Sequence, residues 1–145
     1  MTILDANVLL YAYNVDSPHH AAAARWLAEL FASDETVAIP LLTIWAFIRV
    51  ATNPRLSPQA LAANQAFGFV ERWLDQPGIV VLQPGPRHLE ILKRLTLEYG
   101  VSGQLVTDAV LAALALENGA ALASTDQDFR RFPELRWINP LRELR

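Results

Sequence analysis

The sequence predicts an α/β fold: a three-layer sandwich in which a short, mainly parallel sheet of four to five strands carries helices on both faces. Short apolar runs alternate along the chain with longer segments of helical periodicity, which is the order that such a sheet requires. The short runs are apolar throughout, as in strands that are buried on both faces. With 145 residues, 52% of them hydrophobic, the chain can bury a core, and we expect one domain over residues 1–145.

The predicted strands are five short apolar runs, and each lies next to residues that break regular structure. They cover residues 2–4, 36–39, 79–82, 121–123 and, as the shortest, 137–138. Asp5 follows the first strand directly, and we expect a turn over residues 5–7. Pro40 follows the second strand, and a run of polar residues from Ser124 follows the fourth.

The predicted helices lie between these strands. They cover residues 18–31, 41–51, 57–74, 87–99 and an apolar run opened by Asp108, while residues 8–13 form a short helix or an extended segment. Ser17-Pro18 and Ser57-Pro58 are helix-start signals, because serine caps a helix and proline suits its first position. Thr52-Asn53-Pro54 stops the second of these helices. Gly100 and Gly119 are typical of helix ends.

Composition excludes several classes of protein. The chain has no cysteine, so it holds neither disulfides nor cysteine zinc sites. No apolar run reaches the roughly 18 residues of a transmembrane helix, and the N-terminus does not resemble a signal peptide. We therefore expect a cytoplasmic protein without a membrane partner. No phosphate-binding loop, dinucleotide fingerprint, nucleophile-elbow motif or HExxH motif is present.

Four aspartates are placed for joint chemistry. Asp5 ends the first strand, Asp108 opens a helix, and Asp126 and Asp128 follow the fourth strand. Active sites of open α/β sheets form beyond the C-terminal ends of the strands, so these carboxylates are expected to converge. Such a cluster repels itself unless protons or cations neutralise it, and its hard oxygen ligands suit Mg²⁺ or Mn²⁺.

Each aspartate also has a purely structural reading. Asp108 could stabilise the start of its helix, and Asp126 and Asp128 could stabilise a turn. Asp5 is harder to explain in this way, because a carboxylate directly after a buried strand needs a partner or a cation. The placement of all of them at element ends favours a joint metal-dependent hydrolase site.

The sequence resembles a known family, the PIN domains. Residues 4–10 (LDANVLL) resemble the opening motif of the family, residues 106–115 (VTDAVLAALA) its central helix, and residues 124–129 (STDQDF) its late acidic motif. Residues 47–55 (FIRVATNPR) and 136–141 (RWINPL) are similar to VapC-type toxins of bacterial toxin–antitoxin pairs. The resemblance covers nearly the whole chain, and the ordered set of motifs is more specific than any one of them.

The resemblance implies a Mg²⁺- or Mn²⁺-dependent endoribonuclease that cuts RNA, is neutralised by a VapB-like antitoxin and usually forms a homodimer. Carried over by motif, Asp5, Asp108 and Asp126 are catalytic metal ligands. Asp128 is a further catalytic candidate, as a ligand or a group that holds water. The resemblance also assigns Asn7 and Thr125 as hydrogen-bonding residues that orient the ligands.

One position departs from the family pattern. Ala46 stands where the family usually has a glutamate, directly before Phe47, and alanine cannot bind a metal. An alternative is therefore a PIN-fold binding module that pairs with an antitoxin but cleaves poorly. A more distant alternative is a haloacid-dehalogenase-like phosphatase. That class requires Asp-x-Asp after the first strand and a catalytic lysine, whereas this chain has Asp5-Ala6-Asn7 and only Lys93.

Substrate contacts are expected from arginines, since eleven of the twelve basic residues are Arg. The candidates for contacts with RNA phosphates are Arg49, Arg55, Arg130 and Arg131. For Arg49, pairing with a structural carboxylate is an equal alternative. Trp45 and Phe47 could stack on bases, but we expect them in the core or in a dimer interface. The net charge of −3 argues against general attraction to RNA.

Overall fold

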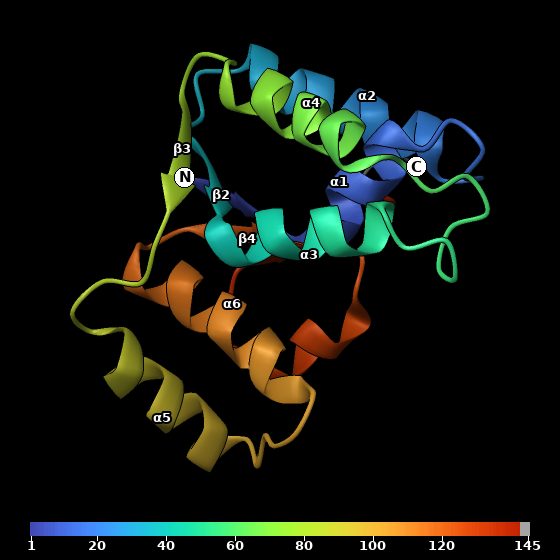
Figure 1. The fold of residues 1–145 in the computed structure, drawn as a ribbon. Coiled ribbons are helices and arrows are strands. Elements are labelled where there is room, and N and C mark those ends of the chain that lie inside the picture. Colours follow the sequence, from blue (N-terminus) through green and yellow to red (C-terminus); the bar gives the residue numbers. More distant parts are fainter. Residues whose placement is uncertain (143–145) are drawn as a thin grey trace.

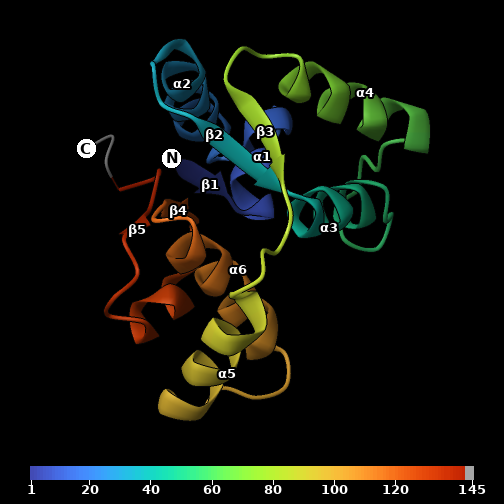
Figure 2. The same cartoon turned by 90° about the vertical axis from the view of Figure 1, so that its left-hand side faces the viewer.

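The computed structural model describes residues 1–142, so the last three residues of the expected domain lie outside the described part. It contains one five-stranded sheet with the strand order β3-β2-β1-β4-β5, and every neighbouring pair is parallel. The strands are β1 (Thr2–Leu4), β2 (Val37–Pro40), β3 (Ile79–Leu82), β4 (Ala121–Ala123) and β5 (Trp137–Ile138). The predicted α/β sandwich is confirmed (Figures 1 and 2).

Six α-helices and one short 3₁₀ helix surround this sheet in the described residues. They are α1 (Ala6–Tyr13), α2 (His20–Ala32), α3 (Leu41–Ala51), α4 (Ala63–Leu74), α5 (His88–Glu98), α6 (Leu105–Glu117) and η1 (Gln127–Arg131). Figure 2 shows α5 at one end of the molecule with α6 beside it, and α2 and α4 at the opposite end. No helix within residues 1–142 combines the length and apolarity needed to cross a membrane.

Two apolar cores, one on each face of the sheet, hold the layers together. Ile3 of β1 packs into the core formed with α5 and α6, whereas its neighbour Leu4 packs into the core formed with α1 to α4. Successive side chains of a strand point to opposite faces. A strand that is covered on both sides therefore favours apolar residues on both faces, which explains Ile3 and Leu4 in β1 and the apolar composition of β4.

The edge strand β3 does not follow this rule. Val80 and Val81 are 41% and 43% exposed, so the expectation of strands buried on both faces was wrong for this strand. β3 has a strand neighbour on one side only. Branched apolar residues still suit its pleated backbone, because strand propensity does not require complete burial.

Two helix starts differ from the prediction. Helix α4 begins at Ala63, not at Ser57, because residues 52–62 form turns in which the backbone N–H groups of Leu56 and Ser57 both donate to the Asn53 carbonyl. Helix α2 begins at His20, where the Ser17 hydroxyl accepts a hydrogen bond from the His19 N–H in the preceding turn. Both Ser-Pro pairs therefore lie in turns before a helix.

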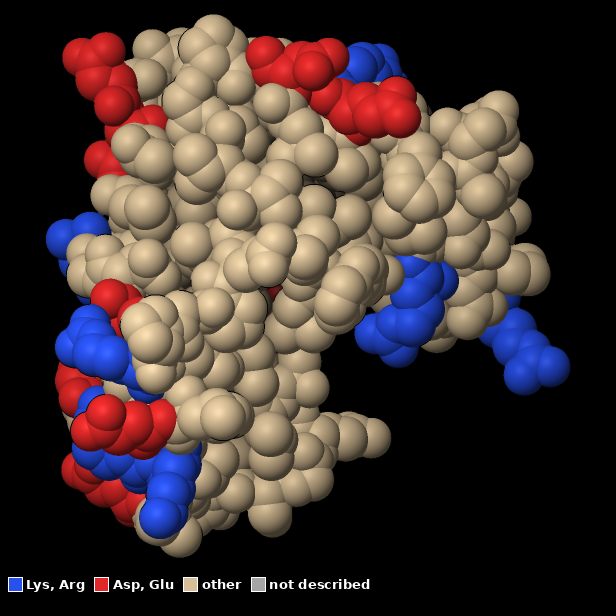
Figure 3. Space-filling view, turned by 60° about the vertical axis from the view of Figure 1, so that its left-hand side comes forward, with Lys and Arg blue, Asp and Glu red and all other residues tan. Residues whose placement is uncertain are grey.

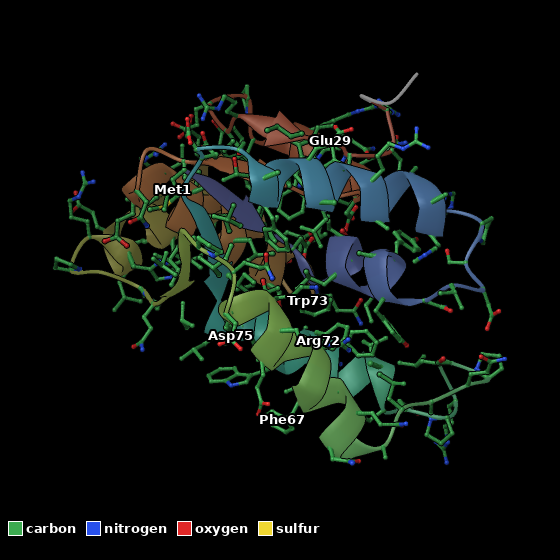
Figure 4. The ribbon with its side chains drawn as sticks, turned by 90° about the horizontal axis from the view of Figure 1, so that it is seen from above. Met1, Glu29, Phe67, Arg72, Trp73 and Asp75 are labelled. Carbon is green, nitrogen blue, oxygen red and sulfur yellow. The ribbon has the colours of Figure 1, made fainter. Side chains whose placement is uncertain are left out.

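The segment after β1 is also more regular than expected. Residues 5–7 are not a separate turn, because Asp5 is the N-cap of α1 and the helix starts at Ala6. The ambiguity over residues 8–13 is resolved in favour of helix. Figure 4 shows Trp73 of α4 on the side facing the interior, where its ring packs edge-on against the buried Phe47 ring, and Phe67 on the outer side. Phe47 is thus a core residue, as expected.

Candidate metal site and active site

The site forms where β1 and β4 end side by side. The parallel register pairs Leu4 with Ala123, so the next residues of the two strands, Asp5 and Ser124, lie opposite each other. The Asp5 N–H donates to the Ala123 carbonyl at 3.0 Å and continues the ladder by one residue. The C-terminal edge of the sheet therefore brings together two polar side chains that are 119 positions apart in the chain.

The Asp5 carboxylate is held by three hydrogen bonds. One oxygen accepts from the Ala6 N–H at 2.7 Å, and the other accepts from the Ser124 hydroxyl at 2.7 Å and the Asn7 amide at 3.2 Å. Burial raises the pKa of Asp5, and the charge of Asp126 adds to this rise, while the hydrogen bonds from Ser124, Ala6 and Asn7 lower it. The carboxylate is thus fixed in orientation but remains costly to ionise.

Asn7 and Ser124 connect the two strand ends. The Asn7 amide donates to the Ser124 hydroxyl at 3.0 Å, and its carbonyl oxygen accepts from the Thr125 N–H at 3.1 Å. The fully buried Ser124 hydroxyl also accepts from the Asp126 N–H at 3.1 Å. This network links Asp5 to the loop that carries Asp126.

Asn7 contacts the Asp5 carboxylate as the family resemblance implies, whereas Ser124 was not among the predicted site residues. The signal was available, because Ser124 follows β4 as Asp5 follows β1. For Thr125, the structure shows a contact through the backbone N–H, while its hydroxyl makes no hydrogen bond within residues 1–142. The structure therefore connects Thr125 to Asn7 through the main chain, and its role in orienting ligands stays a prediction.

Three carboxylates lie close enough for one cation. Asp108 from the first turn of α6, Asp126 and Asp128 each offer one oxygen atom, and these atoms lie within 4.8 Å of one another. Octahedral Mg²⁺ has bonds of about 2.1 Å, which place its ligand oxygens about 3 to 4 Å apart. A slight contraction of the cluster would satisfy this geometry, so the donor set fits a hard divalent cation.

The negative charges of the carboxylates in this cluster repel one another. Burial and the neighbouring charges of Asp126, Asp5 and Asp128 raise the pKa of Asp108 to about 6, while Arg131 lowers it. Asp126 in addition caps η1 by accepting from the Asp128 N–H at 2.9 Å. The structural reading of Asp126 as a turn residue is therefore correct as far as it goes, and it is compatible with the second oxygen serving as a ligand.

A cavity of about 300 Å³ adjoins Asp5. It lies between α3 and α6, and its lining consists of Asp5, Leu42, Thr43, Trp45, Ala46, Arg49, Thr107 and Leu111. Ala46 therefore borders the same space as Asp5, although it carries no ligand atom. Arg49 stands in the lining without an ion-pair partner among the described residues.

Of the other three arginines that were predicted to contact RNA, Arg131 lies beside a carboxylate of the site, whereas Arg55 does not line the cavity. Arg131 donates to the Asp128 carbonyl at 3.1 Å, and its guanidinium lies 3.9 Å from the Asp128 carboxylate. Arg130 lies over the Trp137 ring, 5.8 Å from its centroid. Arg55 belongs to the turns between α3 and α4 and does not line the cavity. Arg49 and Arg131 are thus the arginines that the fold brings to the carboxylates.

Comparison with known proteins finds one matching family and relatives that are similar over nearly the whole chain. The PIN domain family matches residues 2–135. The chain is 43% identical to Ribonuclease VapC31 and 42% identical to Ribonuclease VapC37, both of Mycobacterium tuberculosis H37Rv, over 140 residues each. These alignments cover 97% of this chain and 99% and 97% of the two relatives.

Solved structures share the fold at lower identity. VapBC2 from Rickettsia felis, bound to a fragment of its promoter DNA, matches with a TM-score of 0.73 at 18% identity, covering 95% of this chain and 97% of the other. FitAcB from Neisseria gonorrhoeae matches with a TM-score of 0.66 at 18% identity, covering 98% and 99%.

Removing the Ser124 hydroxyl should destabilise the fold. Ser124→Ala takes a donor from Asp5 and an acceptor from the Asn7 amide and the Asp126 N–H, and unsatisfied buried groups cost about 1 to 3 kcal/mol. Urea unfolding of Ser124→Ala should show this loss. Thr125→Val is the matched control, because the Thr125 hydroxyl has no partner within residues 1–142. Equal stability of the two variants would show that the network contributes little.

The carboxylate cluster should make stability depend on pH in the absence of divalent cations. Because folding raises the pKa of Asp108 from 3.8 to about 6, its contribution to stability is fully present below about pH 4 and is lost as the pH rises through about 6. In EDTA, the melting temperature should therefore fall over this range more steeply for the native protein than for Asp108→Asn. Asp75→Asn, at an exposed position after α4, should retain the native slope. Identical slopes for the native protein and Asp108→Asn would contradict this electrostatic account.

Proposed function

The chain belongs to the PIN domain family, and from this premise we propose that it is a metal-dependent endoribonuclease of the VapC type that a cognate antitoxin neutralises. One observation carries the proposal: the C-terminal edge of the sheet and the start of α6 place Asp5, Asp108, Asp126 and Asp128 in one electrostatically coupled group. The full-length similarity to VapC ribonucleases supports RNA as the substrate.

We assign Asp108, Asp126 and Asp128 to direct contact with Mg²⁺ or Mn²⁺, and Asp5 to the face of the site next to the cavity. A divalent cation supplies charge to stabilise the phosphoryl oxygens and to acidify a water molecule. The protein orients these carboxylates itself: the Asp128 N–H fixes the ligand Asp126, and Ser124 and Asn7 fix the neighbouring Asp5. The raised pKa of Asp108 means that cation binding must displace a proton below about pH 6.

The arginines beside the carboxylates would hold the RNA backbone. Arg49 stands in the cavity lining on one side, and Arg131 stands beside Asp128 on the other. Guanidinium groups suit phosphate oxygens because they donate in a planar fork. This local arrangement allows RNA to bind to a protein whose net charge is −3.

We also propose that the protein acts in the cytoplasm, that a VapB-like antitoxin covers this site and that the toxin forms a homodimer. The support for the antitoxin is that the solved complexes named VapBC and FitAcB match more than nine-tenths of this chain. The phosphatase alternative has little support, because that class needs a catalytic lysine beside the carboxylates. The chain has only Lys93, which lies in α5 and not in the elements that carry the carboxylates.

The binding-module alternative rests on Ala46 alone. Ala46 borders the cavity beside Asp5, so a carboxylate at this position would lie at the site, and its absence reduces the negative charge available to a cation. Fewer carboxylates weaken the affinity for a divalent cation. This second candidate therefore predicts an antitoxin-binding protein with weak cleavage.

Cleavage of total RNA by the purified chain tests the proposed function. With Mn²⁺ or Mg²⁺, the native protein should give discrete fragments that are absent with EDTA and at least about a hundredfold reduced in Asp5→Asn and Asp108→Asn. Thr125→Val should cleave at the native sites. If all variants cleaved equally, the activity would come from a contaminant, and if RNA stayed intact while the antitoxin bound, the binding module would replace the enzyme.

Restoring a carboxylate at position 46 should strengthen cation binding. We expect Ala46→Glu to bind Mn²⁺ at least about tenfold more tightly than the native protein, because it adds a carboxylate beside Asp5, and a tenfold gain corresponds to about 1.4 kcal/mol. Isothermal titration measures this affinity directly. Ala46→Gln has the same size without the charge and should show no such gain. An equal gain in both variants would argue for packing rather than charge.

A further inference from the structure

The cavity beside Asp5 has features that cation binding does not explain. Its volume of about 300 Å³ is at the lower end of the roughly 300 to 1,000 Å³ that small-molecule sites occupy, so it suits one planar ring system rather than a longer polymer segment. None of Asp108, Asp126 and Asp128 lines it. Asp5 is the only residue that belongs to both the cavity and the coupled group of carboxylates.

The walls of the cavity suit a flat, partly polar ring. Leu42 of α3 and Leu111 of α6 provide apolar surface on opposite sides. The Thr107 hydroxyl also lines the cavity and makes no hydrogen bond within residues 1–142, so it can donate to or accept from a ligand. The Thr43 hydroxyl, in contrast, already donates to the Leu4 carbonyl at 2.8 Å.

The rim of the cavity combines an aromatic ring with a cation. Trp45 is 62% exposed, which is unusual for so large an apolar side chain. Arg49 follows one helical turn later, so both side chains lie on the same face of α3. Within residues 1–142, the Arg49 guanidinium forms no ion pair and the Trp45 ring forms no aromatic or cation–π contact, so both can contact a ligand. The expectation of a core position is therefore wrong for Trp45.

The small side chain of Ala46 keeps this space open. Ala46 lies between Trp45 and Arg49 in the lining and opposes α6. A longer acidic side chain at this position would project into the cavity and repel a phosphate that approaches Arg49. Alanine leaves the cavity open and places no negative charge beside the Arg49 guanidinium.

The shape of the surface gives a strand access to this place. Figure 3 shows a hollow between the part of the molecule formed by α5 and α6 and the part formed by α3 and α4, with basic side chains on the α3 and α4 side. The cavity also lies between these parts, because its lining comes from α3 and α6. A base that is turned out of the strand would meet Trp45 and the cavity mouth.

We propose that the cavity receives one base of a single-stranded RNA next to the phosphate that is cut, with Trp45 stacked on the base, Arg49 on its phosphate and Ala46 providing the room. This inference rests on the proposed ribonuclease function and adds a residue set that selects the nucleotide at one position beside the cut. A base is favoured over a protein side chain because the aromatic ring, the free hydroxyl and the guanidinium match the three parts of a nucleotide.

The first test measures RNA binding without cleavage. In EDTA, the dissociation constant for a fluorescent pool of random single-stranded RNA octamers is compared by anisotropy between the native protein and cavity variants. Ala46→Leu, which fills the cavity, and Trp45→Ala should each weaken binding at least about fivefold, as expected for the loss of one stacked base. Ala46→Ser, which keeps the room, and Trp45→Phe, which keeps a ring, should stay within about twofold.

Leu89→Ala controls for a general loss of exposed apolar surface, because Leu89 is 77% exposed on α5. Equal binding by Ala46→Leu and Ala46→Ser would overturn the proposal. The same holds if Ala46→Leu weakened only the binding of the antitoxin, since the cavity would then receive a protein side chain.

The second test maps the cut sites in a random RNA library with Mn²⁺. The native protein and Ala46→Ser should share a preference for one nucleotide at a fixed position beside the cut, and Ala46→Leu should lose it. An unchanged preference in Ala46→Leu would overturn the inference while leaving the ribonuclease intact. If no RNA were cut, the proposed function would fail, and the binding test in EDTA would still decide whether the cavity accepts a base.

Discussion

The hydrogen bond from the Ser124 hydroxyl to the Asp5 carboxylate joins the ends of the two central strands, and the rest of the site depends on it. Parallel pairing of β1 and β4 brings the two residues opposite each other, and the 2.7 Å contact holds them there. Ser124 in turn accepts from the Asp126 N–H, so the loop that carries Asp126 is positioned by the same hydroxyl. The paired strands thereby hold the carboxylates of Asp5 and Asp126 close together against their mutual repulsion.

This arrangement has an electrostatic cost. Burial, together with the charges of Asp126, Asp5 and Asp128, raises the pKa of Asp108 to about 6. Such a group destabilises the folded protein at neutral pH unless a cation is bound, which is a common relation between stability and activity. The two apolar cores on either side of the sheet supply the stability that the site removes. Alanine at position 46 adds no further carboxylate to this group, and its small side chain leaves the cavity beside Asp5 open.

Much of the fold and of the carboxylate group was predictable because both depend on short-range signals. The bounds of β1, α3 and β4 agree with the apolar runs of the sequence, and an aspartate at a strand end is visible without a structure. The start of α4 was not predictable, since the Ser57-Pro58 pair serves a turn that the Asn53 carbonyl closes. Ser124 was missed because its importance comes from the register of two strands, and the cavity was missed because α3 and α6 meet only in the folded chain.

The most direct test of the central claim is anomalous X-ray scattering from crystals of the chain soaked in Mn²⁺. We expect a peak bounded by the carboxylates of Asp108, Asp126 and Asp128, on the side of the cluster that faces Asp5, and the loss of this peak in Asp108→Asn. A cation bound elsewhere in the molecule, with the carboxylate cluster empty at saturating Mn²⁺, would contradict it. The coupled carboxylates would then serve only to shape the strand ends, and the ribonuclease assignment would lose its chemical basis.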